Sequence, residues 1–173
     1  MTAPVFVDTN VFVYARQSNE RLRQPVAAQW VERLWREETG RTSMQVLSEC
    51  YVTLTRKIKP ALTREEAWEH IRDLLTWNPQ PTDAELLVRA REIEDRYGLS
   101  WWDSLIVGAA ELQDCALLLT EDLQDHAVYG GVTVRNPFSL GVSEGMATYG
   151  TPPRTVSRHP PRGRPRRAAA LPA

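Results

Sequence analysis

Pro4-Val5-Phe6-Val7-Asp8 is a short, continuous apolar run that ends on an acid. Such a run is typical of a strand that is covered on both faces. Residues 115–119, Cys-Ala-Leu-Leu-Leu, repeat the pattern late in the chain and lead into Thr120-Glu121-Asp122. Helical patterns lie between the two runs, so we expect strand–helix–strand units with right-handed crossovers. The sequence therefore predicts an α/β fold with a central, mostly parallel sheet.

The region between the two runs has apolar residues at helical spacing, separated by capping and breaking residues. Gly40 is expected to end the first helix and Gly98 the fourth. Thr63 and Glu66 have the spacing of a capping box, and Ser100 is a suitable N-cap for the last helix. The expected helices are residues 25–38, 44–57, 63–77, 83–97 and 100–113, and further short strands are expected at residues 41–43 and 132–134.

Charge is distributed unevenly along the 173 residues, whose net charge is −1. Residues 151–173 carry six arginines and no acid, whereas residues 1–150 carry 15 basic and 22 acidic residues, a net charge of −7. The end of the chain is rich in Pro, Arg and Ala, a composition typical of disorder. We expect one folded domain over residues 1–145 and a disordered tail over residues 146–173. The tail either contacts nucleic acid through its charge or has no function of its own.

Neither membrane insertion nor export is indicated. No apolar run approaches the roughly 20 residues that span a bilayer, and the first residues lack the basic region of a secretory signal. Cys50 and Cys115 each lie in an apolar stretch, without a Cys or His at metal-ligand spacing, so we expect two buried, reduced thiols. These features favour a cytoplasmic protein with no membrane contact.

Two carboxylates directly follow the two apolar runs. Asp8 ends the first run, and Asp122 lies just beyond the second. Each has an ordinary alternative, because Asp8 has the position of a helix N-cap and Asp122 that of a polar turn residue. In a parallel sheet, however, ligands bind beyond the carboxyl ends of the strands. If both strands are central, Asp8 and Asp122 lie close together at that edge.

Asp103 and Glu49 are weaker candidates. Asp103 follows Ser100 at capping-box spacing, yet the helix after it is apolar almost all round and is expected to be buried. Its small residues, 108–110, would let that helix approach the sheet closely. An acid at the mouth of a buried helix is costly unless it is paired or coordinated, which favours a functional role. Glu49 flanks the apolar side of the 44–57 helix and by itself is typical of a solvated glutamate.

Four carboxylates in one place would repel each other, and their pKa values would rise unless a cation intervened. Hard divalent ions such as Mg²⁺ prefer oxygen ligands, and this set offers no His or Cys for zinc. His70, His126 and His159 have no matching spacing. The chemistry that uses such a site is phosphodiester hydrolysis, in which the metal orients the phosphate and activates a water molecule.

Four segments of the chain are similar, in order and spacing, to the motifs of PIN domains. They are residues 5–11 (Val-Phe-Val-Asp-Thr-Asn-Val), residues 45–49 (Gln-Val-Leu-Ser-Glu), residues 100–106 (Ser-Trp-Trp-Asp-Ser-Leu-Ile) and residues 119–123 (Leu-Thr-Glu-Asp-Leu). The last segment, with residues 130–138 after it, resembles the closing part of VapC-type toxins. Each motif alone is weak, but the four in order cover residues 4–138.

The resemblance implies a three-layer α/β/α fold and an endoribonuclease that depends on Mg²⁺ or Mn²⁺. It implies that Asp8, Glu49, Asp103 and Asp122 are the catalytic, metal-binding acids. Asn10 and Thr120 would be polar supports that orient the acids or the water. It further implies products with a 5′-phosphate and a 3′-hydroxyl, a homodimer, and a small cognate antitoxin that silences the toxin. Glu121 and Asp125 are ambiguous acids, which we expect not to be essential.

Two other functions compete with the nuclease. One is a catalytically silent module, in which the acids bind a structural metal or a basic partner and the tail holds RNA. The other is a different α/β phosphoryl-transfer protein. A haloacid-dehalogenase-like phosphatase needs a second Asp two residues after Asp8, where this chain has Asn10. A receiver domain needs paired early acids and a late lysine, and no lysine follows Lys59.

Overall fold

Five short strands form the sheet in the computed structural model, which describes residues 3–139. They are β1 (Val5–Val7), β2 (Gly40–Arg41), β3 (Leu117–Leu119), β4 (Val128–Tyr129) and β5 (Val132–Arg135). Their order in the sheet is β2-β1-β3-β5-β4. β1 pairs in parallel with β2 and β3, and β3 pairs in parallel with β5, whereas β4 and β5 form an antiparallel hairpin. The predicted α/β fold with a mostly parallel sheet is confirmed.

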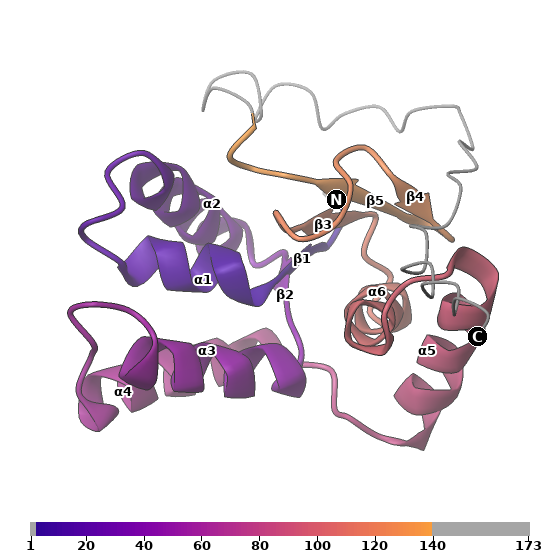
Figure 1. Ribbon diagram of the computed structural model, residues 1–173, viewed down its shortest axis with the longest axis horizontal. Coiled ribbons are helices and arrows are strands. Elements are labelled where there is room, and N and C mark those ends of the chain that lie inside the picture. Colours follow the sequence, from indigo (N-terminus) through magenta and orange to yellow (C-terminus); the bar gives the residue numbers. More distant parts are fainter. Residues whose placement is uncertain (1–2, 140–173) are drawn as a thin grey trace, which may run out of the picture.

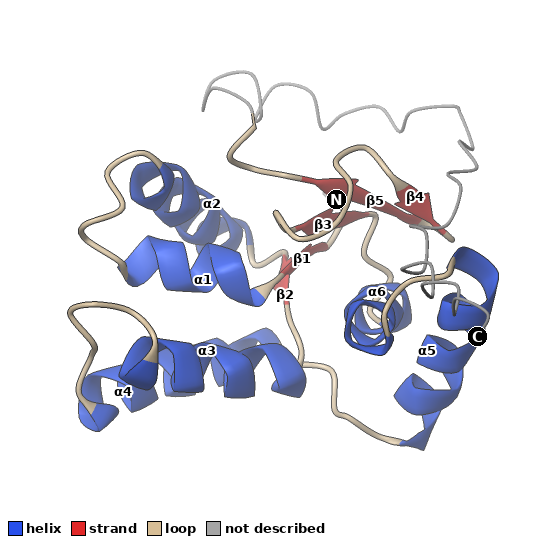
Figure 2. Cartoon of the chain, viewed as in Figure 1, coloured by secondary structure: helices blue, strands red, loops and turns tan. Residues whose placement is uncertain are grey.

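Helices flank this sheet, as Figures 1 and 2 show. They are α1 (Thr9–Arg16), α2 (Arg23–Glu37), α3 (Met44–Arg56), α4 (Arg64–Leu74), the 3₁₀ turn η1 (Leu75–Trp77), α5 (Ala84–Tyr97) and α6 (Trp101–Leu112). α1 packs against both α2 and α3, α3 packs against α4, and α5 packs along α6. α1 and the edge strand β4 were not among the expected elements, because both are too short to give a clear periodic pattern.

Most helix boundaries follow the capping residues in the sequence. Thr63 and Glu66 form the predicted capping box of α4, and Ser100 caps α6 by accepting a hydrogen bond from the backbone N–H of Asp103. Gly98 ends α5 in the left-handed conformation, at φ 68°, which glycine adopts without steric cost. These local interactions fix where each helix begins or ends before any tertiary packing is considered.

Two expectations about glycines were wrong. Gly40 does not end α2: Glu38 adopts the left-handed conformation there, at φ 55°, and Gly40 begins β2 instead. Glycine is needed at position 40 because a Cβ would lie 2.4 Å from Cζ3 of the Trp77 ring. The expectation for residues 108–110 fails at Gly108, which faces α5: the nearest atoms to a Cβ there belong to Leu86, Ala90 and Ile93.

The core places the carboxyl ends of β1 and β3 side by side. Phe6 pairs with Leu118 and Val7 with Leu119, and these side chains are buried. The backbone N–H of Asp8 then donates to the carbonyl of Leu119 at 3.1 Å. The chain segments that follow the two strands therefore leave the sheet at neighbouring points of one edge.

Some expectations concern membrane contact, the thiols and the end of the chain. Within residues 3–139, the structure has no helix of the length and apolarity that a bilayer crossing requires. Cys50 and Cys115 are buried and unpaired, as predicted. The expected domain boundary at residue 145, the basic tail over residues 146–173 and His159 all lie outside the described residues.

Candidate active site

Asp8 is both a helix cap and a member of the strand-end cluster, so its two interpretations are compatible. Its side chain is buried, with only 7% exposed. The backbone N–H of Thr9 donates to Oδ1 at 2.7 Å, which caps α1, and the Thr120 hydroxyl donates to Oδ2 at 2.7 Å. Each carboxylate oxygen of Asp8 is therefore held from a different direction, and the side chain is fixed at the end of β1.

Thr120 and Asp122 reach the same place from the end of β3. Thr120 is fully buried, and its hydroxyl accepts a hydrogen bond from the backbone N–H of Asp122 at 3.1 Å. This short turn directs Asp122, whose side chain is exposed, back toward Asp8. The expectation that Asp8 and Asp122 lie close together at one edge agrees with these contacts.

Asn10 lies between the two acids. Its amide nitrogen Nδ2 is 3.1 Å from Oδ2 of Asp122, 3.1 Å from the Thr120 hydroxyl and 3.5 Å from Oδ2 of Asp8. Its amide oxygen Oδ1 is buried and has no hydrogen-bond partner among the described residues. A buried polar oxygen without a partner is costly, so this oxygen is an available ligand atom, although it is Nδ2 that faces the two carboxylates.

Glu49 joins the cluster from α3. The Thr9 hydroxyl donates to Oε2 of Glu49 at 3.3 Å, and the Gln45 side chain donates to Oε1 at 2.9 Å, four residues earlier on the same helix. Thr9 and Gln45 were not singled out from the sequence. The spacing of Gln45 and Glu49 on a helix was the available signal, because residues four apart share one helix face.

The electrostatics of Asp8 reflect its surroundings. Burial raises the pKa of the Asp8 carboxyl to about 6, against the hydrogen bonds from Thr120 and Thr9, which lower it. The negative charges of Asp122 and Glu49 raise it further. The charges of an acid that follows β3 and an acid on α3 thus act on Asp8, which follows β1. We call Asp8, Glu49 and Asp122, with Asn10 and Thr120, the acidic edge. Within residues 3–139, no ion pair joins an Arg, Lys or His to these acids.

The hydrogen bonds of Asp103 are made with Ser100 and not with the residues of the acidic edge. The Ser100 hydroxyl donates to Oδ2 of Asp103 at 2.7 Å and accepts from its backbone N–H at 3.1 Å. The ordinary interpretation, a capping interaction at the start of α6, is therefore realised. No described hydrogen bond links Asp103 to the other three acids. As expected, α6 is buried all round from Ser104 to Ala110.

Glu121 and Asp125, the two ambiguous acids, are engaged in contacts of their own. Glu121 accepts a short hydrogen bond of 2.6 Å from the Tyr14 hydroxyl and lies 3.4 Å from Nε of Arg23. Asp125 accepts from the backbone N–H of Asn136 at 2.9 Å and pairs with the buried Arg135 at 3.2 Å. Both acids therefore organise the loops after β3 and β5.

The described histidines do not contribute to the acidic edge. His70 lies against the Phe12 ring, and burial lowers its pKa to about 4, so this side chain is neutral at physiological pH. His126 is exposed beside Asp125, with Nε2 3.5 Å from Oδ2 of that acid. Both agree with the surface or structural roles expected from the sequence.

The donors of the acidic edge fit a hard divalent cation. They are carboxylate oxygens and the unpartnered amide oxygen of Asn10, the atom types that Mg²⁺ and Mn²⁺ prefer. Burial and the charges of Asp122 and Glu49 raise the pKa of Asp8, so a cation bound here would favour its ionised form. Within residues 3–139, however, no three His, Cys, Asp or Glu side chains are already grouped as a complete metal site.

Comparison with known proteins agrees with the fold and with the resemblance to PIN domains. The PIN-domain family matches residues 5–130, and the chain belongs to this family. The structure is similar to a chain of a toxin–antitoxin complex from Klebsiella pneumoniae, with a TM-score of 0.54 and 18% sequence identity. That similarity covers 77% of this chain and 97% of the other, and at this identity it concerns the fold. No curated protein matches the chain.

Proposed function

We propose that this protein is a metal-dependent endoribonuclease that cleaves RNA phosphodiester bonds. The observation that supports it is the convergence of Asp8, Glu49 and Asp122, from three separate segments, around a place where no Arg, Lys or His of residues 3–139 pairs with them. Burial and the charges of Asp122 and Glu49 raise the pKa of Asp8, which destabilises the fold at neutral pH unless an external positive charge compensates. Membership of the PIN-domain family supports a nuclease role for a cation bound at the acidic edge.

In this proposal, Asp8, Glu49, Asp103 and Asp122 are the catalytic acids that hold Mg²⁺ or Mn²⁺. When bound, the ion would orient the phosphate and make a bound water molecule a better nucleophile. Thr120 and the backbone of Thr9 keep both oxygens of Asp8 in place. Without a bound metal ion, the amide nitrogen of Asn10 lies between Asp8 and Asp122. The amide oxygen of Asn10 has no partner among the described residues and is available as a further ligand.

The order of elements supports including Asp103. α6 is followed by a tight turn, in which the N–H of Cys115 donates to the carbonyl of Ala110, and then by β3. A helix that precedes a parallel strand in this way runs back against it, so its first residues lie toward the carboxyl edge of the sheet. We expect Asp103 to leave the Ser100 hydroxyl and join the acidic edge when a cation is present.

We further propose that the protein is the toxin of a type II toxin–antitoxin pair, of the VapC type. The similarity to a chain from a toxin–antitoxin complex supports this, as does the resemblance of the segment after β3 to VapC-type toxins. The partners would be an RNA substrate, a cognate antitoxin and a second copy of the chain, in the cytoplasm. Co-expression with the adjacent reading frame, followed by purification of a complex, tests the partnership.

Cleavage of structured RNA by the purified chain tests the activity. We expect Mg²⁺ or Mn²⁺ to be required, products to carry a 5′-phosphate and a 3′-hydroxyl, and Asp8→Asn to abolish cleavage. Glu94→Gln is a matched control, because it also removes one carboxylate but lies on α5. A cleaving Asp8→Asn protein would show that the acidic edge is not the catalytic centre.

One observation favours a second candidate, a catalytically silent PIN-like module. Asp103 is already satisfied by Ser100, which leaves three acids rather than four at the acidic edge. Such a module would bind a metal or RNA without cutting it. Metal-dependent RNA binding with intact RNA on a gel, for several RNAs and both metals, would favour this candidate over the nuclease.

A further inference from the structure

Two neighbouring loops carry basic side chains that the fold does not use. The loop between α1 and α2, residues 17–22, contains Arg21, and the loop between α3 and α4, residues 57–63, contains Lys57 and Lys59 and is followed by Arg64. All four side chains are exposed and have no ion pair among residues 3–139. We call these four residues the basic loop pair.

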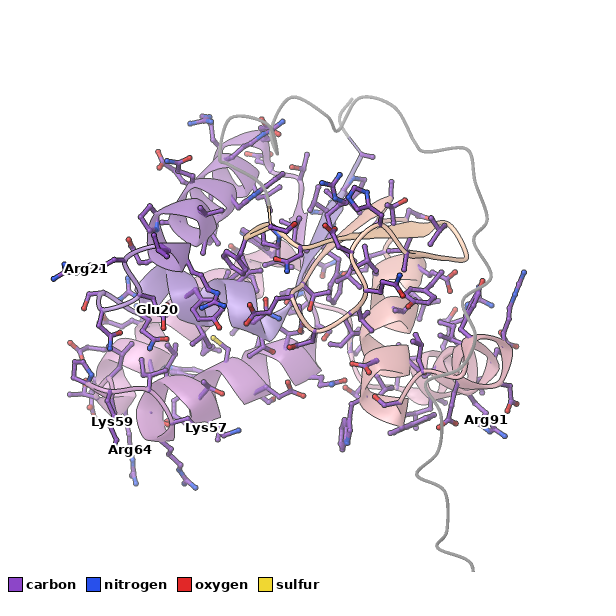
Figure 3. The ribbon with its side chains drawn as sticks, turned by 45° about the horizontal axis from the view of Figure 1, so that its top comes forward. Glu20, Arg21, Lys57, Lys59, Arg64 and Arg91 are labelled. Carbon is purple, nitrogen blue, oxygen red and sulfur yellow. The ribbon has the colours of Figure 1, made fainter. Side chains whose placement is uncertain are left out.

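The two loops are tied together in space. The side-chain amide of Asn19 donates to the backbone carbonyl of Lys59 at 2.9 Å. In Figure 3, Arg21, Lys57, Lys59 and Arg64 lie along one side of the molecule and project outward, while Arg91 of α5 lies on the opposite side. Glu20 is next to Arg21 in the chain but contacts Arg23, at 3.7 Å, so Arg21 keeps its charge unpaired.

A hollow lies beside the first loop of the basic loop pair, and its lining includes Glu121, the neighbour of Asp122. Its volume is about 520 Å³, within the range of about 300–1,000 Å³ typical of pockets that hold small ligands. Arg21, Arg23 and Phe138 also line it, whereas Lys57, Lys59 and the acids of the acidic edge do not. α1 spans eight residues between the acidic edge and the first loop, a length of roughly 12 Å. An extended RNA strand covers that distance with a few nucleotides.

The net charge of residues 1–150 gives a local basic surface a role in binding an RNA substrate. Residues 1–150 carry a net charge of −7, and the acidic edge adds a concentrated negative field where the RNA must react. A polyanion is held chiefly by cations that contact its phosphates, whereas the summed charge of this body repels it. Unpaired cations close to the reacting edge offset that repulsion.

Resting on the proposed nuclease function, we propose that the basic loop pair binds the phosphate backbone of single-stranded RNA that leaves the acidic edge through the hollow. Lys57 and Lys59 contact phosphates beyond the hollow, and Arg21 contacts a phosphate at its rim. The surface follows the backbone rather than the bases, because it offers compact positive charges and few hydrogen-bonding side chains.

The test is the salt dependence of RNA binding by the full-length chain in EDTA, where no cleavage occurs. A fluorescent single-stranded RNA of about 12 nucleotides suits a surface of this length. For Lys57→Gln/Lys59→Gln, the slope of log K against log salt should fall by roughly 1.4, and binding near 0.1 M salt should weaken on the order of 25-fold, at about 0.7 per lost phosphate contact. Melting temperature should not change, since Asn19 contacts only the backbone of Lys59.

The matched control is Arg91→Gln/Arg96→Gln, which removes the same charge from exposed positions on α5. Its salt slope should change by less than about a quarter of the change in the lysine variant, because charges that do not contact phosphates release no counterions on binding and are screened by salt. The basic tail is the same in both variants and does not bias the comparison. Equal losses in the two variants, or a wild-type slope in the lysine variant, would overturn the inference.

Failure of the nuclease proposal and failure of this inference are distinguishable. If the lysine variant shows the expected fall in salt slope but the wild type never cleaves RNA, the nuclease proposal is contradicted and the basic loop pair is supported. A chain that cleaves RNA while the lysine variant keeps its affinity contradicts only the basic loop pair. If that variant instead loses binding to poly-glutamate, the surface belongs to an acidic protein partner, and the inference is wrong.

Discussion

Carboxylates are treated differently in two regions of this molecule. On α5 and α6, acidic side chains bind arginines of α5: Glu92 and Glu111 pair with Arg89, and Glu94 and Asp95 pair with Arg91. At the acidic edge, Asp8, Glu49 and Asp122 have hydroxyls, amides and a backbone N–H around them, but no paired arginine, lysine or histidine among the described residues.

The difference in partners distinguishes acids that stabilise the fold from acids that are candidates for a function. A carboxylate that forms an ion pair within the chain needs no external cation, and the ion pair contributes modestly to stability. Acids that are oriented by neutral groups and crowd each other are held at a cost in stability, and such sites are where functions are found. A buried acid with a raised pKa belongs to the second kind.

The largest expected contrast between the two regions is in catalysis. Asp122→Asn should lower RNA cleavage by about 100-fold or more, a loss of about 2.7 kcal/mol of transition-state stabilisation. Glu92→Gln removes a carboxylate of the same charge from α5 and should leave the rate within about twofold, because it touches no part of the acidic edge. Initial rates on one RNA, at saturating Mn²⁺, measure both. Equal effects of the two substitutions would erase the distinction between the regions.

In the metal-free protein, removing a carboxylate from the acidic edge and removing one from α6 should change the free energy of unfolding in opposite directions. Asp8→Asn removes a buried charge whose pKa is raised to about 6, so we expect the free energy of unfolding at pH 7 to rise by about 1–3 kcal/mol. Glu111→Gln weakens the ion pair of 2.7 Å with Arg89 and should lower it by about 1 kcal/mol. Urea unfolding in EDTA gives both values. A destabilised Asp8→Asn protein would mean that its capping bond outweighs its charge.

The pH dependence of that stability has a defined sign. An acid with a folded pKa of about 6 and an ordinary value of 3.8 binds its proton more tightly in the folded state. Its contribution is therefore fully present below pH 3.8 and is lost as pH rises through 6. Between pH 4.5 and 7, the wild type should lose about 2 kcal/mol relative to Asp8→Asn in EDTA. Parallel stability curves for the two proteins would contradict the raised pKa.

The smallest expected effect separates Glu121 from the acidic edge. Tyr14→Phe removes the hydroxyl that donates to Glu121 at 2.6 Å and should lower the free energy of unfolding by about 1 kcal/mol. Binding of Mn²⁺ should be unchanged, because Glu121 serves the loop rather than the ion. Calorimetric titration of the variant with Mn²⁺ checks this. A clear loss of metal affinity would instead make Glu121 a ligand.

Much of the fold follows from local sequence signals. Two apolar runs that end on acids predicted β1, β3 and their parallel pairing, and capping residues such as Thr63 and Ser100 set helix boundaries. The errors concern glycines whose role is tertiary. Position 40 is glycine because the Trp77 ring approaches it from a distant segment, and no local rule contains that contact.

The candidate site was less accessible to sequence reasoning. Asp8 and Asp122 were predictable because parallel strands share one edge, but Glu49 resembles any solvated glutamate until α3 packs against α1. The central position of Asn10 arises from contacts across 110 residues of chain. For Asp103, local sequence favoured capping and functional interpretations alike, and the structure displays the capping contact.

Binding of Mn²⁺ to the metal-free chain tests most directly whether the acidic edge exists to hold a cation. Electron paramagnetic resonance of free Mn²⁺, titrated against wild type and Asp8→Asn at pH 7.5, measures it without any RNA. The account predicts that the wild type removes Mn²⁺ from solution and gains melting temperature, while Asp8→Asn binds more than about tenfold more weakly. Identical binding curves for the two proteins, or no uptake by the wild type, would contradict it.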